Sequence, residues 1–106
     1  MVTAFTAIIL AALVQSAAIN SQRDNYLGCL DKAVAAATAQ KTPSAAFEAH
    51  LRQSCADAEA KFEAALIAFD LKNKVPRKQA QADAQVQVDD FISNLVGRYR
   101  VVTPSQ

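Results

Sequence analysis

The residues best suited to covalent chemistry in this chain of 106 residues are its two cysteines, Cys29 and Cys55. Their spacing is too long for a redox Cys-x-x-Cys motif. Together with the single histidine, His50, they also supply too few ligands for a structural zinc site. In an oxidising compartment an even number of cysteines predicts a disulfide, whereas in the cytosol the pair would remain buried thiols. We expect a structural Cys29–Cys55 disulfide, with two buried thiols as the alternative.

The other polar residues do not form a catalytic set. No acid or second histidine is placed to assist His50, and we expect it to be a surface side chain. Asp83, Asp89 and Asp90 are spaced for a solvated helix face rather than for paired acid and base catalysis in a cleft. With only two glycines the chain has no glycine-rich phosphate loop. The sequence predicts no catalytic, cofactor-binding or metal-binding residue, and a protein that is not an enzyme.

A cluster of positive charge is the remaining candidate for binding. It consists of Lys72, Lys74, Arg77 and Lys78, four cations within seven residues. In an exported protein this basic cluster could meet the phosphates of phospholipid or lipopolysaccharide, or an acidic protein. The simpler interpretation is compensation of a helix dipole together with solubility at a loop. The chain as a whole carries a net charge of only +1, which gives no long-range field to attract nucleic acid or an anionic membrane surface.

Residues 1–18 are predicted to be a cleaved secretion signal. Every charged side chain lies at Arg23 or beyond. Residues 4–14 are apolar except for one threonine, and small residues follow, as in the hydrophobic segment and cleavage region of a signal peptide. The first three residues carry no Lys or Arg, which departs from the usual positive start. Cleavage is expected after Ala18, with Ala17 and Ser16 as alternatives.

Two other interpretations of this leader are an uncleaved membrane anchor and a buried core helix. A membrane-spanning helix needs about 20 apolar residues, and the apolar run of the leader is shorter than that. We therefore expect the mature protein in the periplasm or outside the cell.

The rest of the chain is predicted to be helical. Apolar residues recur every three or four positions, which is typical of helices with one buried face. Ser21 and Asp24 have the spacing of a capping box, and Thr42 is expected to cap the next helix with Pro43 in its first position. The expected helices cover residues 21–39, 43–73 and 76 to 96 or 100, and residues 101–106 are expected to be a flexible tail.

The cysteines give a test of how these helices are arranged. In two antiparallel helices joined by a short loop, residues at the same height average to the loop midpoint. Cys29 and Cys55 average to position 42, inside the turn that the capping pattern predicts. The same rule places Tyr26 opposite Ala58, and about the second turn it places Leu51 opposite Tyr99. The prediction is an all-α protein in which residues 19–100 form a three-helix up-down-up bundle with one disulfide.

The segment Tyr26-Leu27-Gly28-Cys29-Leu30, followed by an alanine-rich helix and Cys55, resembles short exported two-cysteine helical proteins of unassigned function in alphaproteobacteria. The resemblance covers roughly residues 20–70. It implies a periplasmic setting and assigns no activity to any residue.

We expect a small exported interaction protein with a protein partner of unknown identity. One alternative is a carrier of a small apolar ligand between the helices. Another is a membrane-tethered envelope subunit that keeps its leader. No cofactor is expected, and membrane contact is expected only through the leader or the basic cluster.

Overall fold

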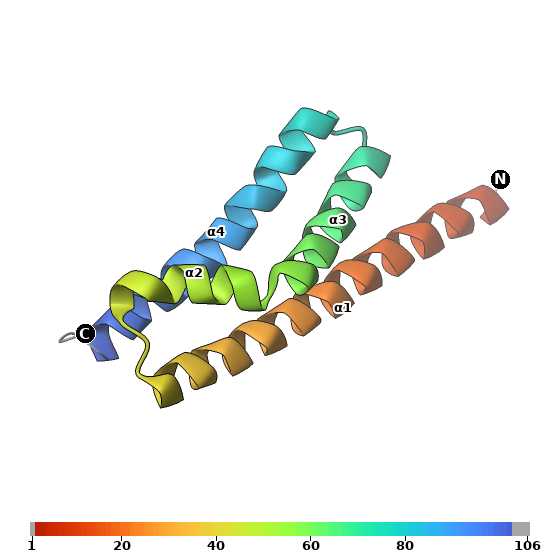
Figure 1. Ribbon diagram of the computed structural model, residues 1–106. Coiled ribbons are helices and arrows are strands. Elements are labelled where there is room, and N and C mark those ends of the chain that lie inside the picture. The colour runs from red at the N-terminus through yellow and green to blue at the C-terminus, as the bar shows by residue number, and fades with distance from the viewer. Residues whose placement is uncertain (1, 103–106) are drawn as a thin grey trace.

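The protein is all-helical, as its sequence predicts. The computed structural model describes the backbone of residues 2–102 and the side chains of residues 16–102. Within this part of the chain there is no β-strand. The helices, shown in Figure 1, are α1 (Val2–Gln40), α2 (Ser44–Ser54), α3 (Ala56–Lys72) and α4 (Arg77–Val102).

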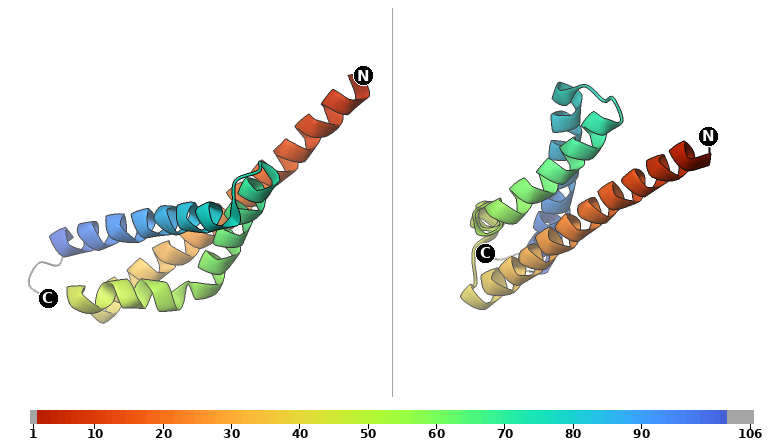
Figure 2. Two further views of the ribbon diagram at one scale, coloured as in Figure 1. Left: turned by 90° about the horizontal axis from the view of Figure 1, so that it is seen from above. Right: turned by 90° about the vertical axis from the view of Figure 1, so that its right-hand side faces the viewer.

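The helices α2 and α3 hold the molecule together. Both α1 and α4 pack against them, whereas the backbones of α1 and α4 scarcely approach each other. In Figure 2, α1 runs obliquely to α4, and the N-terminal part of α1 extends away from the other helices. The predicted apolar faces meet in one core, in which Ala residues allow close helix packing. Its buried members are Tyr26, Leu30, Ala33, Ala37, Phe47, Leu51, Cys55, Phe62, Leu66, Ala84, Val88, Ile92 and Tyr99.

The aromatic side chains belong to this core. The rings of Tyr26 and Phe62 stack with centroids 5.8 Å apart, and the edge of Phe91 lies 6.3 Å from Tyr26. Tyr99 stacks on Phe47, with centroids 3.8 Å apart. The expected neighbour of Tyr99 was Leu51, one helical turn away from Phe47. The prediction assumed a straight helix over residues 43–73, and the structure does not contain one.

This expected helix is divided at Cys55. The backbone there has φ −119° and ψ 23°, outside the helical region, and separates α2 from α3. No proline or glycine marks the position, so the sequence carries no local signal for the break. Cys55 is buried and covalently tied to α1. We attribute the division to this tertiary attachment, which lets α2 and α3 follow different courses.

The predicted helix start at residue 21 is also wrong. The helix α1 is continuous from Val2 to Gln40, so Ser21 and Asp24 lie in its interior and are exposed rather than capping. No proline or glycine occurs between the leader and Gly28, and nothing interrupts helix propagation there. The N-terminal part of α1 projects past the other helices (Figure 1).

The turns between helices fall where they were predicted, with different details. Pro43 is the N-cap of α2 and not its first residue, and its side chain makes no cap hydrogen bond. At the other end, α4 passes through Gly97 and reaches Val102. The first two residues of the expected flexible tail, 101–106, are therefore helical, and its remaining residues 103–106 lie outside the described residues.

Candidate functional site

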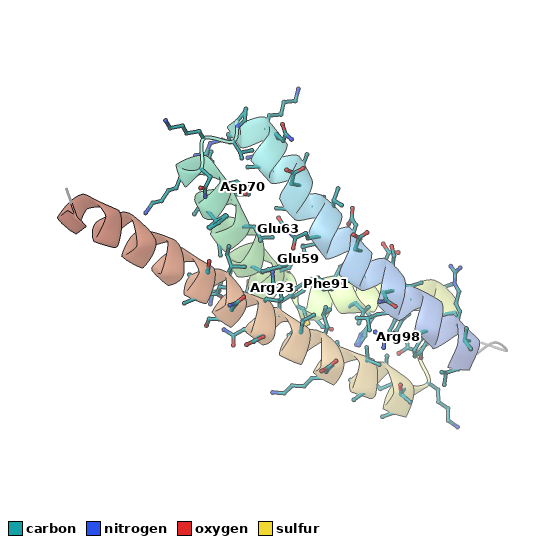
Figure 3. All side chains as sticks on the ribbon, turned by 180° about the vertical axis from the view of Figure 1, so that it is seen from behind. Arg23, Glu59, Glu63, Asp70, Phe91 and Arg98 are labelled. Carbon is teal, nitrogen blue, oxygen red and sulfur yellow. A yellow bond between two sulfur atoms is a disulfide. The ribbon has the colours of Figure 1, made fainter. Side chains whose placement is uncertain are left out.

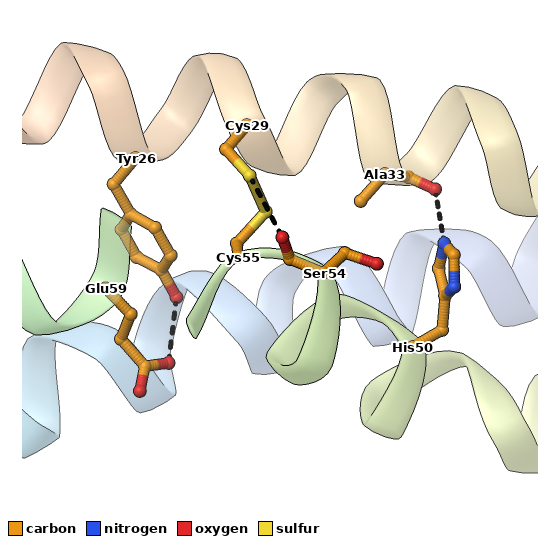
Figure 4. Close-up of a disulfide and its surroundings, with 7 residues drawn as sticks. All are labelled: Tyr26, Cys29, Ala33, His50, Ser54, Cys55 and Glu59. Carbon is orange, nitrogen blue, oxygen red and sulfur yellow. Dashed lines mark hydrogen bonds between the residues drawn. A yellow bond between two sulfur atoms is a disulfide. The ribbon is translucent and has the colours of Figure 1, made fainter. Parts of the chain in front are cut away.

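The two cysteines form the predicted disulfide. The Cys29–Cys55 bond joins α1 to the junction of α2 and α3, with Cα atoms 5.9 Å apart (Figure 4). Cys55 is buried and Cys29 half-buried. The free thiols considered as an alternative are absent, because both cysteines are bonded. The bond therefore acts as a structural cross-link between the first helix and the middle of the fold.

His50 is not the free surface side chain that was expected. It is half-buried, and its Nε2 lies 2.9 Å from the carbonyl oxygen of Ala33 (Figure 4). A carbonyl oxygen can only accept a hydrogen bond, so Nε2 carries a proton and donates it. His50 therefore fastens α2 to α1 one turn of α1 beyond the disulfide.

A charged network around Arg52 was missed at the sequence level. The guanidinium of Arg52 lies 3.1 Å from Glu48 on its own helix and 3.1 Å from Asp89 on α4. A hydrogen bond from Gln85 and one from Arg52 lower the pKa of Asp89. Asp89, which was predicted to lie on a solvated acidic face, therefore forms an ion pair between α4 and α2. Because these side chains are one-third to one-half exposed, the pairing contributes little stability.

A second group of polar side chains, Tyr26, Glu59 and Glu63, adjoins this network through Glu59. The buried hydroxyl of Tyr26 donates a hydrogen bond to Glu59 over 3.3 Å, and burial together with the charge of Glu59 raises the pKa of Tyr26. Burial, with added repulsion from Glu59 and Asp89, also raises the pKa of Glu63. One carboxylate oxygen of Glu63 is buried without a hydrogen-bond partner.

The acids at positions 59 and 63 are one helical turn apart, and a spacing of four on α3 was the signal available in the sequence. Figure 3 shows both where α1, α3 and α4 meet, near Arg23 and Phe91. No nucleophile or cleft accompanies them in the part of the chain with described side chains. We therefore assign this group to packing.

A groove lies between the C-terminal halves of α1 and α4. It consists of two hollows that share Leu95 and Arg98. One, of about 240 Å³, is completed by Val34, Thr38, Tyr99 and Val102. The other, of about 170 Å³, is completed by Leu27, Leu30, Asp31, Phe91 and Asn94.

Apolar surface continues from this groove over the C-terminal end of α4. A third hollow, of about 460 Å³, adjoins it at Arg98 and Val102 and includes Gly97 and Val101. Val101 and Val102 are 79% and 76% exposed, an unusual environment for valine at the end of a packed helix. A Cβ atom on Gly97 would meet nothing within 4 Å, so packing within this chain does not require a glycine there.

The interior of the protein contains large apolar side chains, among them Tyr26, Phe47 and Phe62, each fully buried. The hollows lined by described residues are open to solvent rather than sealed.

The basic cluster lies at the opposite end of α4, around the α3–α4 turn. Lys72, Lys74, Arg77 and Lys78 are all exposed. Among the described side chains the ion pairs centre on Arg52, and none includes a cation of this cluster. The structure thus keeps the four cations together and brings no protein carboxylate to them.

No His, Cys, Asp or Glu side chains of the described residues are grouped to hold a metal ion. Within the same residues, none of the helices has the length and apolar character needed to cross a membrane. Comparisons of the chain with protein-family models, with curated protein sequences and with solved structures found no match.

Proposed function

We propose that this chain is a non-catalytic interaction protein that acts outside the reducing cytosol and binds a segment of a partner protein in the α1–α4 groove. The observation that carries the proposal is the separation of α1 and α4. Each packs on the α2–α3 pair, and several of the apolar residues between them remain only half-buried.

The groove has the make-up of a protein-binding surface. Its centre is aliphatic, with Leu27, Val34 and Leu95 half-buried in the isolated chain. Exposed Val101 and Val102 extend it at one end. Contiguous exposed apolar surface of this kind marks protein interaction sites more often than chance placement does. A partner would bury these side chains and so complete a core that α1 and α4 leave open.

The charges in the groove indicate the chemistry of the partner. Arg98 lines all three hollows and is not part of the ion pairs among the described side chains. An arginine in partly apolar surroundings favours a carboxylate as its partner. The bound segment is therefore proposed to carry an acidic side chain beside its apolar ones, in contact with Arg98.

The setting outside the cytosol is supported by the Cys29–Cys55 bond and by the leader. Structural disulfides persist in oxidising compartments and are rare in reducing ones. Residues 16–18, the proposed cleavage region, are exposed on α1. Export through cleavage after Ala18 would leave Tyr26 and every later core residue in place.

A photo-crosslinking amino acid at Val102 tests the groove in the producing organism. We expect it to capture one discrete partner protein, because Val102 lines two of the three hollows. The same amino acid at Val86 is the matched control, since Val86 is also an exposed valine on α4 (57%) and lines none of these hollows. Equal capture at both positions, or capture at neither, contradicts the proposal.

Charge reversal sharpens the same experiment. Arg98→Glu should abolish the crosslink from Val102, because it would oppose the acidic side chain of the partner. Arg100→Glu changes an exposed arginine two residues away that does not line the hollows and should leave the crosslink intact. A crosslink that survives Arg98→Glu would show that the partner does not use the groove as proposed.

A further inference from the structure

The α3–α4 turn has a fixed backbone. Lys74 has φ 65°, and the amides of Lys74 and Val75 donate to the carbonyls of Leu71 and Asp70 over 3.1 and 3.0 Å. The side chain of Asn73 donates to the carbonyl of Phe69 over 2.9 Å. These bonds satisfy the amides of the turn within the turn itself. The cations on it are therefore presented from a defined backbone.

Helix-dipole compensation explains only part of the basic cluster. Lys72 lies in the last turn of α3, where a cation is favourable. Arg77 and Lys78 lie in the first turn of α4, which contains no acidic residue. A cation at a helix N-terminus is unfavourable, because it faces the positive end of the helix dipole. The fold therefore gains nothing from these two positive charges.

The acids nearest the cluster do not neutralise it. Asp70, in the last turn of α3, is half-buried and uses its carbonyl in the α3–α4 turn, and Asp83 is exposed on the second turn of α4. Neither forms an ion pair with the cluster among the described side chains. The positive charge is thus available to an external anion.

The leader passes beside this turn. Ala18 lines a small hollow, of about 110 Å³, together with Phe69 and Lys72 of α3. The residues of α1 that precede Ala18 extend past the turn (Figure 1). They belong to the segment that is predicted to engage the membrane during export. The basic cluster therefore lies next to the point at which the leader joins the rest of the chain.

We propose that the exposed cluster of Lys72, Lys74, Arg77 and Lys78, fixed on the α3–α4 turn beside the leader, binds the anionic phospholipid headgroups of a bilayer surface. The contact is electrostatic and peripheral. It orients the molecule with the α3–α4 turn toward the membrane and with the C-terminal end of α4, and thus the groove, away from it.

Vesicle binding of the full chain tests this site. The chain is incubated with vesicles of phosphatidylcholine alone and with vesicles that also contain phosphatidylglycerol, so that binding through the leader contributes to both. We expect phosphatidylglycerol to strengthen binding about 600-fold, at roughly fivefold for each of the four cations near the surface. Raising the salt concentration should remove this gain, because the Debye length becomes short. Equal binding to the two vesicle types would overturn the proposal.

Matched charge variants locate the contact. Replacing all four cluster residues with glutamine should abolish the gain from phosphatidylglycerol. The control replaces four other exposed cations, Lys32, Lys41, Lys61 and Arg100, with glutamine and should keep the gain. Equal loss in both variants would show a general charge effect and overturn the site. Displacement of the protein from vesicles by millimolar inorganic phosphate would also overturn it, because the cluster would then be a site for a free anion.

Discussion

The α1–α2 turn and the α3–α4 turn have the same backbone and opposite surroundings. In each, a lysine adopts a left-handed conformation, Lys41 with φ 56° and Lys74 with φ 65°. In each, the following amide reaches back to a helix carbonyl, from Thr42 to Ala37 over 2.9 Å and from Val75 to Asp70 over 3.0 Å. A proline follows soon after both.

The difference lies in what covers the turns. The hydroxyl of Tyr99 donates to the carbonyl of Thr42 over 2.6 Å and is 3.4 Å from that of Ala37, so α4 holds the first turn in place. The second turn is held by its own bonds and carries four exposed cations. The same backbone motif is therefore part of the packed structure at the α1–α2 turn, whereas at the α3–α4 turn it remains exposed and available for contact.

The largest effect on this arrangement should come from the disulfide, which anchors the shared α2–α3 pair to α1. The double substitution Cys29→Ser and Cys55→Ser should lower the free energy of unfolding by about 3–4 kcal/mol, because the unfolded chain gains the freedom of a loop of about 25 residues. Urea denaturation measures this change, and the native protein with reductant should match the variant. A loss below about 1 kcal/mol would mean that packing alone fixes the bend at Cys55.

The covering of the first turn is tested by Tyr99→Phe. This variant keeps the stack on Phe47 and removes the hydroxyl, leaving the carbonyl of Thr42 without its donor from α4. We expect a loss of about 1–2 kcal/mol in unfolding free energy, measured by urea denaturation.

The matched change at the second turn is Asn73→Ala, which removes an exposed side-chain bond to Phe69. It should cost no more than about 0.5 kcal/mol, as for most exposed sites. Equal losses in the two variants would remove the distinction between a covered and an uncovered turn.

The shared backbone is tested by glycine. Lys41→Gly and Lys74→Gly should each raise the free energy of unfolding by about 1 kcal/mol, since glycine adopts a left-handed conformation without steric cost. Thermal unfolding should show similar gains for both, because the φ values are alike. A gain at only one turn would mean that the lysine side chain compensates for strain at the other.

Sequence reasoning located both turns because their chemistry is local. Proline, a capping pattern and the end of an apolar stripe are sufficient to place them at Pro43 and Pro76. The same stripes identify the core, and the midpoint rule pairs Cys29 with Cys55. These features depend on residue spacing along one or two helices, which the sequence shows directly.

The features that sequence reasoning missed depend on how helices that are distant in the sequence pack together. The break at Cys55 follows from attachment to α1. The ion pair of Arg52 with Asp89 joins residues 37 positions apart. The groove arises because α1 and α4 each pack on the α2–α3 pair and scarcely approach each other. No local pattern encodes a divergence angle, so the candidate binding surface became visible only in the structure.

The smallest expected effect concerns Glu63, which lies in α3 between Cys55 and the α3–α4 turn. Its folded pKa is raised above the ordinary value of 4.5, so the folded state retains a proton that the unfolded chain releases. The free energy of unfolding therefore falls as the pH rises from the ordinary pKa of the unfolded chain to the raised pKa of the folded state. Glu63→Gln should be more stable than the native protein at pH 7 and should lose that advantage below pH 4.5, as measured by thermal unfolding across pH.

Asp89→Asn provides a comparison of opposite sign. Because the folded pKa of Asp89 is lowered, its carboxylate stabilises the native protein above the ordinary pKa and loses this contribution as the pH falls through the folded value. The asparagine variant should therefore be less stable than the native protein at pH 7 and approach it in acid. If both variants moved in the same direction with pH, burial of Glu63 would not be the cause of its shift. Glu63 would then not be a carboxylate that opposes folding.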